Sequence, residues 1–447
     1  MGNKDSTERK HELHTGDTSK DSKEQHVSLA SETFKALEAR STSDGNTATG
    51  HVSRNVFQEF FSHPSHADFG RLLFDSFQRS QGALSSDVMS RNTYEVAANR
   101  ARELMTFHNY YFTLFADGKE TLGIVELSAM LEACFVITIF KVDRVTEEEQ
   151  NVIASLVKSA MGTSSGIGIS EFDGWASECC LRLFDGVHAW LLRRLMDATW
   201  NGLAEIQLES RSSHLINAAM LWLCSTFLPS CFCNGQVPGG ATLHHVALPS
   251  LPEWTLLYDS SDQGLSLNRF EHNCFKYQSP TVMLVSLSDD FSFCVATDEE
   301  WRESVQRWGS INTIVTQISP KLRHFEGGAS TLYLNQKTRG LPLGIQIGSN
   351  PKLPILSIDK GMATATHAHV ARTLYRIEVW GCGTEADKSA QTTHRQWEAQ
   401  QAQKERKVKL PGHWDEDNPD MALLEMAGVK VHHSERGDVR AAPRGAP

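Results

Sequence analysis

The sequence predicts an α+β protein, in which a helical N-terminal region is followed by an antiparallel β domain and a helical tail. Between residues 53 and 205, apolar residues recur every three or four positions, as in amphipathic helices. Between residues 206 and 382, apolar and polar residues alternate between Gly, Asp and Ser turns, which favours an antiparallel sheet with one buried face. Residues 383–447 begin with a charged, Gln-rich segment that predicts helix again. A chain of 447 residues is long enough for two or three domains.

The composition indicates a globular protein that does not bind nucleic acid. Hydrophobic residues make up 40% of the chain and charged residues 22%. The formal net charge of -11 leaves no basic cluster that could displace counterions from phosphates. Nine cysteines without a secretory signal indicate reduced thiols in the cytosol. The longest apolar stretch, residues 215–232, is broken by Pro229, and we therefore expect a buried helix there instead of a membrane span.

Residues 1–52 are polar and nearly free of aromatic residues, so we expect them to be disordered. The first six residues, Met-Gly-Asn-Lys-Asp-Ser, match the N-myristoylation motif, with Gly2 as the acylated residue and Ser6 at its fixed position. A chance Met-Gly start is the alternative. One acyl chain gives only reversible membrane attachment, and the basic residues nearby are interleaved with acidic ones. Either a protein partner at the membrane supplies the second attachment, or attachment stays switchable.

Two loops in the helical region have the rhythm of EF-hands, in which two helices flank a short loop with a central apolar residue. They span residues 117–128 and 162–173, with Ile124 and Ile169 taken as the eighth positions. In this register Ser128 stands where calcium requires a bidentate Glu, and the second loop begins with Gly and Ser. We therefore predict an EF-hand-like scaffold without bound calcium. A calcium-responsive regulator is kept as an alternative.

Other candidate chemistry is sparse, and no metal, cofactor or catalytic residue is predicted. One group of zinc-type ligands lacks the short paired spacings of structural zinc sites, and it comprises Cys224, Cys231, Cys233, His244 and His245. His367 and His369 are expected on one face of a strand without a third ligand. A thiol-dependent antioxidant enzyme is a further alternative, and it would require an activated thiolate.

Between residues 215 and 382 several motifs resemble those of the TLDc family. The resemblance lies in three motifs: a strand that ends at Tyr258, a Gly-x-Ser-Leu motif that follows it, and a closing strand. The signature residues of these motifs are Trp254, Leu256, Leu257, Tyr258, Gly264, Leu267 and Trp380. The resemblance implies a β-sandwich of two sheets with flanking helices. Residues 293–295 and 353–359 depart from the family pattern, which indicates a divergent member.

The C-terminal tail contains a short segment that is predicted to be a partner-binding helix. It is preceded by the capping pair Asn418 and Pro419, and it carries Met421, Leu423, Leu424, Glu425 and Met426. A helix this short is unstable in isolation, so it must dock on another surface. Together with the Met-Gly-Asn start and the helical region, this tail resembles the mTOR-associated lysosomal branch of the TLDc family.

The resemblance implies a non-catalytic adaptor or regulator. Its expected partners are subunits of the vacuolar proton pump, the V-ATPase, together with the membrane surface through the N-myristate and components of the mTOR pathway. Its expected location is the cytoplasm, as a peripheral protein on the lysosomal or vacuolar membrane. Its expected roles are protection against oxidative stress and mTOR-type signalling. Leu423, Leu424 and Glu425 would supply apolar burial and charge at the docking surface.

Overall fold

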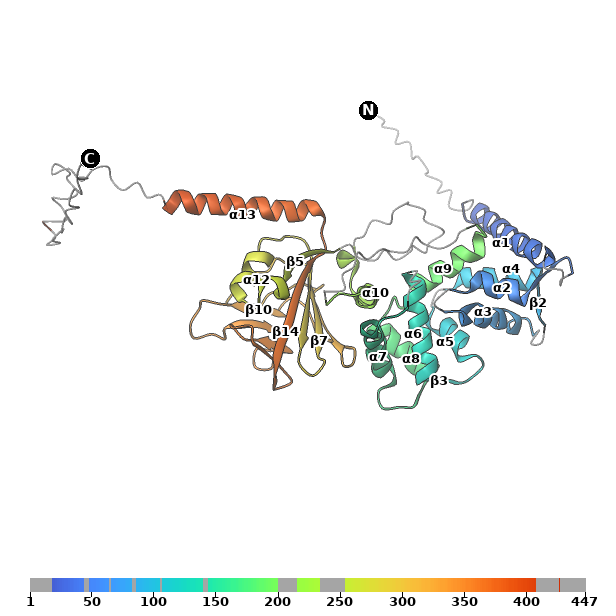
Figure 1. Cartoon of the computed structure of the whole chain (residues 1–447), viewed down its shortest axis with the longest axis horizontal. Coiled ribbons are helices and arrows are strands. Elements are labelled where there is room, and N and C mark those ends of the chain that lie inside the picture. The colour runs from blue at the N-terminus through green and yellow to red at the C-terminus, as the bar shows by residue number, and fades with distance from the viewer. Residues whose placement is uncertain are drawn as a thin grey trace, which may run out of the picture. The chain divides into compact units, whose positions relative to one another are not determined.

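A computed structural model describes most of the chain, which divides into two compact units, Met1–Gln391 and Thr392–Pro447. The described residues are 18–43, 48–63, 66–82, 86–104, 107–139, 144–199, 215–233, 254–406 and 426. The first unit contains a helical region and a ten-stranded antiparallel sheet (Figure 1). The predicted α+β class, with helices before a large antiparallel sheet, is confirmed.

The first part of the helical region consists of two helix–loop–helix units joined through their loops. Its elements are α1 (Thr18–Ser43), β1 (His51–Ser53), α2 (Arg54–Phe61), α3 (Asp68–Arg79), β2 (Val88–Ser90) and α4 (Arg91–Glu103). Strands β1 and β2 pair antiparallel, and Ser53 and Ser90 cap the helices that follow them. Phe57 packs against Phe74 and Tyr94, so the predicted aromatic stripe forms the core of this part.

The second part repeats the same arrangement. Its elements are α5 (His108–Ala116), β3 (Thr121–Gly123), α6 (Ile124–Thr138), α7 (Glu147–Met161), β4 (Gly166–Gly168), α8 (Ile169–Cys179) and α9 (Asp185–Met196). Strands β3 and β4 pair antiparallel, and Thr146 and Glu149 form a capping box at the start of α7. The helical pattern between residues 171 and 200 therefore belongs to two helices, α8 and α9, with a turn at residues 180–184.

The predicted disorder of residues 1–52 is wrong for Thr18–Ser43, which form helix α1. Phe34 and Leu37 are fully buried, and the Phe34 ring lies 5.6 Å from that of Tyr94 on α4. The segment has few apolar residues, but Ala30, Phe34 and Leu37 share one face of the helix. Packing on the rest of the helical region supplies the burial that the isolated segment lacks.

The β domain begins with α10 (Ala218–Phe227) and the short 3-10 helix η1 (Ser230–Phe232). Helices α11 (Ser260–Gln263) and α12 (Leu267–Cys274) follow the first strand, and α13 (Glu385–Arg406) follows the last. The strands are β5 (Thr255–Asp259), β6 (Thr281–Leu287), β7 (Ser292–Thr297), β8 (Ile314–Ser319), β9 (Arg323–Phe325), β10 (Leu332–Asn335), β11 (Gly344–Ile347), β12 (Leu356–Ile358), β13 (Thr364–His367) and β14 (Val370–Gly381). No helix in the described part of the chain is long and apolar enough to cross a membrane.

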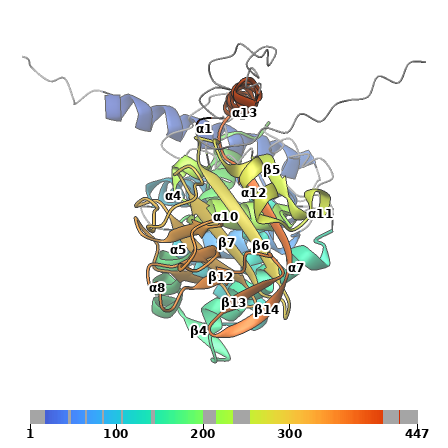
Figure 2. The same cartoon turned by 90° about the vertical axis from the view of Figure 1, so that its left-hand side faces the viewer.

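Strand β14 belongs to both halves of the sheet. Its first residues pair with β13, and its last residues lie between β5 and β6. Figure 2 shows β6 beside β7. Apolar residues of β6–β8 and of β10–β12 share one core cluster, which includes Val285, Phe293, Ile345 and Leu356. The sheet is therefore folded over a common core, as the predicted sandwich requires.

The central strands are buried on both faces, although the sequence predicted one buried face. On β6, Met283 and Val285 point into the sandwich core, whereas Val282 and Leu284 pack with α10 and the helical region. The Ser159 hydroxyl on α7 donates to the Leu322 carbonyl (2.7 Å), and the His324 ring contacts the Cys179 carbonyl (2.8 Å). Helices on the outer face thus explain the nearly continuous apolar run of β6.

Candidate functional site

The predicted signature residues gather where strand β5 meets β14 and helix α12. Trp254, Leu257, Tyr258, Leu267 and Trp380 are buried, and Leu256 and Gly264 are half-buried. The Trp254 indole donates to the Phe232 carbonyl (2.8 Å), and the Tyr258 hydroxyl donates to the Gly264 carbonyl (2.8 Å). Gly264 has a φ of 81°, which favours glycine at this turn. The signature residues therefore hold the turn and the helix that follows it.

A charged network connects this turn to the closing strand. Arg376 on β14 contacts Asp259 at the end of β5 (2.5 Å) and Glu378 on its own strand (3.1 Å). Glu378 is fully buried and accepts hydrogen bonds from the Leu215 N–H (2.5 Å) and the Trp380 indole (3.0 Å). Burial raises the pKa of Glu378, although these donors and Arg376 favour its charged form. The network ties the start of the domain to its first and last strands.

The cysteines near α10 are buried or half-buried and do not resemble an activated thiol site. Cys224 and Cys294 are fully buried, and Cys382 is nearly so. Burial raises the pKa of Cys233 to about 11, and it raises the pKa of Cys231 as well. His244 and His245 lie outside the described residues. Among the described residues no group of three or more His, Cys, Asp or Glu side chains is arranged to hold a metal ion.

The two histidines of the β13–β14 hairpin do not share a strand face, which corrects the sequence prediction. His367 ends β13, and its Nδ1 lies 2.7 Å from the Ile355 carbonyl oxygen. His369 is exposed in the turn, with a φ of 65°. Ala368 and His369 both adopt left-handed backbone, which closes the hairpin and interrupts the alternation of a strand.

A family model of the TLDc domain matches residues 213–383, which overlap the predicted domain 206–382. Residues 213–383 form a TLDc domain. The motif departures do not interrupt its fold, because residues 293–295 lie within β7 and residues 356–358 form β12. The buried signature residues and the charged network around Arg376 therefore stabilise the interior of this TLDc domain.

Similar proteins include yeast relatives named "Restriction of telomere capping protein 5". The relative from Meyerozyma guilliermondii is 25% identical over 303 residues, which cover 52% of this chain and 50% of the relative. The relative from Candida glabrata is 22% identical over 254 residues, covering 41% of this chain and 45% of the relative. The relative from Zygosaccharomyces rouxii is 24% identical over 307 residues, which cover 53% of this chain and 52% of the relative. The chain thus spans about half the length of the curated relatives it matches.

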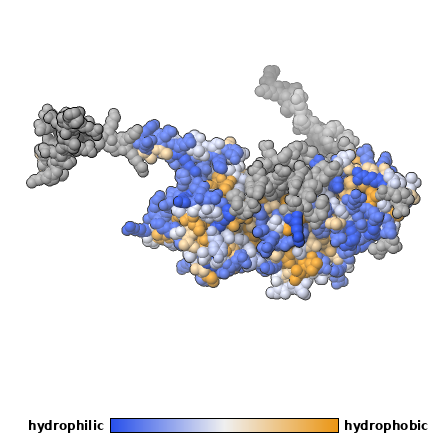
Figure 3. Space-filling view, in the orientation of Figure 1, coloured by the Kyte–Doolittle hydropathy of each residue, from blue (hydrophilic) through white to orange (hydrophobic). Residues whose placement is uncertain are grey.

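The helical region before the TLDc domain has a different loop register from the one predicted. The central buried residues of the paired loops are Leu122 on β3 and Ile167 on β4. Ile124 and Ile169 begin the following helices and are 57% and 38% exposed. Figure 3 shows an apolar area on this end of the helical region. The predicted register is shifted by two residues because each loop has two apolar residues that could be its central one. These are Leu122 and Ile124 in the first loop, and Ile167 and Ile169 in the second.

In the corrected register, the first loop contains three acidic residues, and protein cations neutralise two of them, Asp117 and Glu126. Glu126 takes the twelfth position, and its carboxylate contacts the ammonium of Lys119 (2.5 Å), which lowers the pKa of Glu126. Asp117 is held by Arg79 (2.6 Å) and Arg71 (3.2 Å). Burial opposes the charge of Asp117, but these arginines lower its pKa. The first position is Phe115, which offers no side-chain oxygen for calcium.

The second loop retains one acidic residue in the corrected register. Glu171 takes the twelfth position, and its carboxylate accepts a hydrogen bond from the Gly168 N–H (3.1 Å). The first position is Ala160, and the third is Gly162, so neither supplies a side-chain oxygen. Glu171 therefore caps the helix that follows the loop.

The predicted lipidation and docking residues fall mainly beyond the described residues. Gly2, Met421, Leu423, Leu424 and Glu425 lie outside them, and Met426 is 79% exposed. The predicted helix at residues 386–410 is confirmed as α13 over Glu385–Arg406. Its first turns are attached to the TLDc domain, because Gln391 donates to the Phe275 carbonyl (2.8 Å).

Sequence reasoning did not find two features of this site. The Arg376, Asp259 and Glu378 network joins residues that are 117 positions apart, and the sequence gives no signal for that pairing. The exposed Trp397 on α13 could have been noticed, since a lone Trp in a polar helix is unusual at a fully solvated surface. Hydrophilic side chains dominate the rest of this helix (Figure 3).

Proposed function

We propose that this chain is a non-catalytic adaptor that binds the V-ATPase at the lysosomal or vacuolar membrane. The observation that carries the proposal is the TLDc domain at residues 213–383, because the family is associated with this pump. The inference is by analogy with the family, since a fold alone does not define a function. Protection against oxidative stress and mTOR-type signalling are the cellular roles that we attach to the same adaptor.

The interior of the TLDc domain supports a role without catalysis. Its signature side chains are committed to internal hydrogen bonds, such as those of Trp254 and Tyr258. Reactive thiols have a lowered pKa, whereas burial raises the pKa of Cys233 to about 11 and that of Cys382 well above its ordinary value. A domain built in this way offers surfaces to partners while its defining residues maintain the fold.

Membrane recruitment in this proposal combines a lipid anchor with the pump as a protein anchor. Myristoylation of Gly2 alone would give reversible attachment. The EF-hand-like helical region separates this anchor from the TLDc domain in the sequence, and in its first loop Lys119, Arg71 and Arg79 contact the acidic residues. The pump would then supply the second attachment point, which makes recruitment depend on both partners.

The docking surface in this proposal is the C-terminal tail together with α13. The tail offers Leu423, Leu424 and Glu425, and the exposed Met426 lies next to them. On α13 the Trp397 side chain is 57% exposed, and aromatic anchors of this kind contribute strongly to protein interfaces. Apolar side chains on an amphipathic helix are suited to insertion into a groove of a partner.

A capture experiment from vacuolar or lysosomal membranes tests this function. We expect the intact chain to recover V-ATPase subunits, which are identified by mass spectrometry, and deletion of residues 413–447 to reduce the recovery. The double substitution Leu423→Ala and Leu424→Ala should act like the deletion. A matched control replaces Leu341 and Leu343, which are also exposed leucines two positions apart, and should leave the recovery unchanged. No pump subunits with the intact chain would reject the proposal, whereas unchanged recovery after the deletion would reject only the tail assignment.

A further inference from the structure

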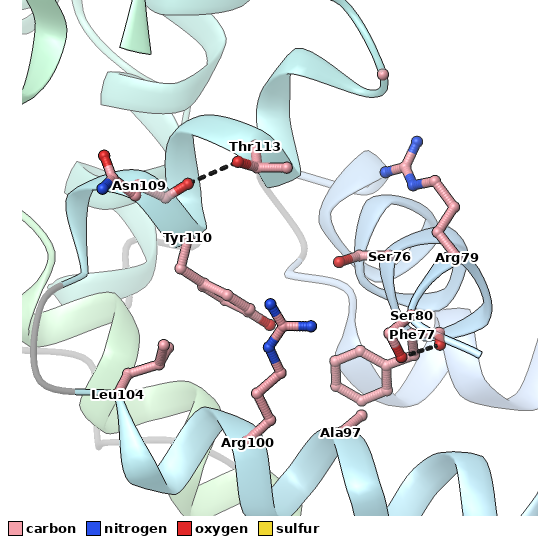
Figure 4. Close-up of a pocket in the computed structure, with 11 residues that line it drawn as sticks. Ser76, Phe77, Arg79, Ser80, Ala97, Arg100, Leu104, Asn109, Tyr110 and Thr113 are labelled. Atoms are coloured by element: carbon pink, nitrogen blue, oxygen red, sulfur yellow. Dashed lines mark hydrogen bonds between the residues drawn. The ribbon is translucent and has the colours of Figure 1, made fainter. Parts of the chain in front are cut away.

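A cavity of about 490 Å³ opens between helices α3, α4 and α5 in the helical region (Figure 4). Its volume lies within the range of small-molecule sites. The lining combines an apolar part, which includes Phe77, Ala97 and Leu104, with polar groups from all three helices. Neither the adaptor function nor the TLDc signature uses this cavity.

The charge of the lining suits an anion. Arg79 and Arg100 line the cavity, and none of its described lining residues is acidic. Arg79 is engaged by Asp117 at 2.6 Å. Arg100 is exposed, and it has no carboxylate partner among the residues that the structure describes. The guanidinium of Arg100 is therefore available for bidentate contact with a carboxylate or phosphate.

A second polar group in the cavity also lacks a partner. The hydroxyl oxygen of Tyr110 is buried, and it makes no hydrogen bond within the described part of the chain. Burial raises the pKa of Tyr110 well above its ordinary value, so the hydroxyl remains a donor at neutral pH. Figure 4 shows the Tyr110 and Arg100 side chains directed toward the same part of the cavity. Buried polar groups without partners are rare in folded proteins, and a ligand is one explanation.

The lining also contains apolar side chains on both sides of Arg100 (Figure 4). Phe77 and Ala97 are buried, and Leu104 is half-buried at the end of α4. A fully hydrated ion such as free phosphate would leave this surface unused. A ligand that carries its charge at one end of an apolar body would use both parts.

We propose that this cavity binds a small organic phosphate, with the phosphate on Arg100 and Tyr110 and an apolar body against Phe77, Ala97 and Leu104. The phosphate accepts hydrogen bonds from the guanidinium and from the phenol, which gives the Tyr110 hydroxyl the acceptor that it lacks. The same chemistry is found in soluble phosphate monoesters and in the headgroup of phosphatidic acid. The inference does not depend on pump binding.

Titration calorimetry of the full chain with phenyl phosphate tests the proposal. We expect saturable binding of phenyl phosphate, and weaker binding of inorganic phosphate and of phenol, because each of these lacks one half of the ligand. Arg100→Gln should weaken binding about tenfold or more, since it removes a charge-assisted contact. Arg144→Gln, an exposed arginine before α7 that does not line the cavity, should leave the affinity unchanged.

Tyr110→Phe separates a ligand contact from a structural role. Without phenyl phosphate this variant should melt at the same temperature as the parent chain or higher, because it removes a buried hydroxyl that has no partner. With phenyl phosphate it should bind more weakly than the parent. Absence of saturable binding at millimolar phenyl phosphate, or equal affinity of the parent and Arg100→Gln, would overturn the proposal. If phosphatidic acid vesicles displace phenyl phosphate and phosphatidylcholine vesicles do not, the natural ligand is assigned to a lipid headgroup. If phenyl phosphate binds and phosphatidic acid vesicles do not displace it, the natural ligand is assigned to a soluble phosphate monoester.

Discussion

The guanidinium of Arg376 lies 2.5 Å from the carboxylate of Asp259, and this ion pair joins strands that are 117 residues apart in the sequence. Asp259 also accepts a hydrogen bond from the Ser261 N–H (2.9 Å) at the start of α11. Through Glu378 the same arginine reaches the beginning of the TLDc domain at Leu215. One charged cluster thus fixes the first strand, the signature turn and the last strand together.

Removing the acidic partner of this cluster should destabilise the TLDc domain strongly. Asp259 is 2% exposed, so Asp259→Ala removes one of the two buried carboxylates that contact Arg376 and leaves Glu378 as the other, at an expected cost of about 3 kcal/mol in the free energy of unfolding. Urea unfolding measures this cost. Glu103→Ala, which breaks a surface ion pair with Arg102, is the control and should cost about 1 kcal/mol or less. A loss for Asp259→Ala as small as that of the control would contradict the assigned role.

The signature tyrosine should affect stability without affecting partner capture. Tyr258→Phe removes the hydrogen bond to the Gly264 carbonyl and should cost about 1 kcal/mol in the free energy of unfolding. Because Tyr258 is fully buried, recovery of pump subunits below the melting temperature should equal that of the parent chain. Loss of recovery by a folded Tyr258→Phe variant would show that the signature contacts a partner.

Stability should fall on acidification because of the buried histidine on α9. Burial lowers the pKa of His188 from 6.5 to about 4, so the unfolded chain binds more protons between these values. The stabilisation is complete above pH 6.5 and is lost as the pH falls toward 4, by an amount on the order of 3 kcal/mol. Unfolding free energies across this range should depend less on pH in His188→Gln. His272→Gln, at an exposed position on α12, should keep the slope of the parent, and an equal slope in all three chains would refute the prediction.

Chelation should not change the stability of the helical region. Lys119 neutralises Glu126, and Arg71 and Arg79 neutralise Asp117, so the loop does not depend on calcium for charge balance. Melting curves in calcium and in excess EDTA should therefore superimpose. A melting temperature that rises with added calcium would show that the loops bind the ion despite their ion pairs.

The native thiols should react slowly. Burial raises the pKa of a group of cysteines, among them Cys179, Cys180, Cys231 and Cys233. Ellman's reagent at neutral pH should label the native chain more slowly than free glutathione, and it should label all nine cysteines after unfolding. A native thiol that reacts faster than glutathione would favour the antioxidant-enzyme alternative.

The sequence predicted the elements that depend on local pattern. The apolar runs of Phe57 to Phe77 and of residues 281–287 became helices and a strand, because periodicity reflects which side chains are buried. The same reasoning failed where burial came from distant contacts. Helix α1 has little apolar surface of its own, and Phe34 is buried through contacts with distant elements, among them Tyr94 on α4.

The candidate sites were less predictable than the fold. The loop register depended on choosing between Leu122 and Ile124, and only the pairing of β3 with β4 distinguishes them. The cavity at Arg100 and Tyr110 requires α3, α4 and α5 to converge, which no spacing within one helix encodes. Side chains brought together by tertiary packing are visible only once the packing is known.

Co-sedimentation of the purified full chain with V-ATPase reconstituted into lipid vesicles tests the central claim most directly. We predict that the chain sediments with pump-containing vesicles at a saturable stoichiometry and remains in the supernatant with pump-free vesicles of the same lipid. The double substitution Leu423→Ala and Leu424→Ala should return the chain to the supernatant. Equal sedimentation with both kinds of vesicle, or none with either, would contradict the account.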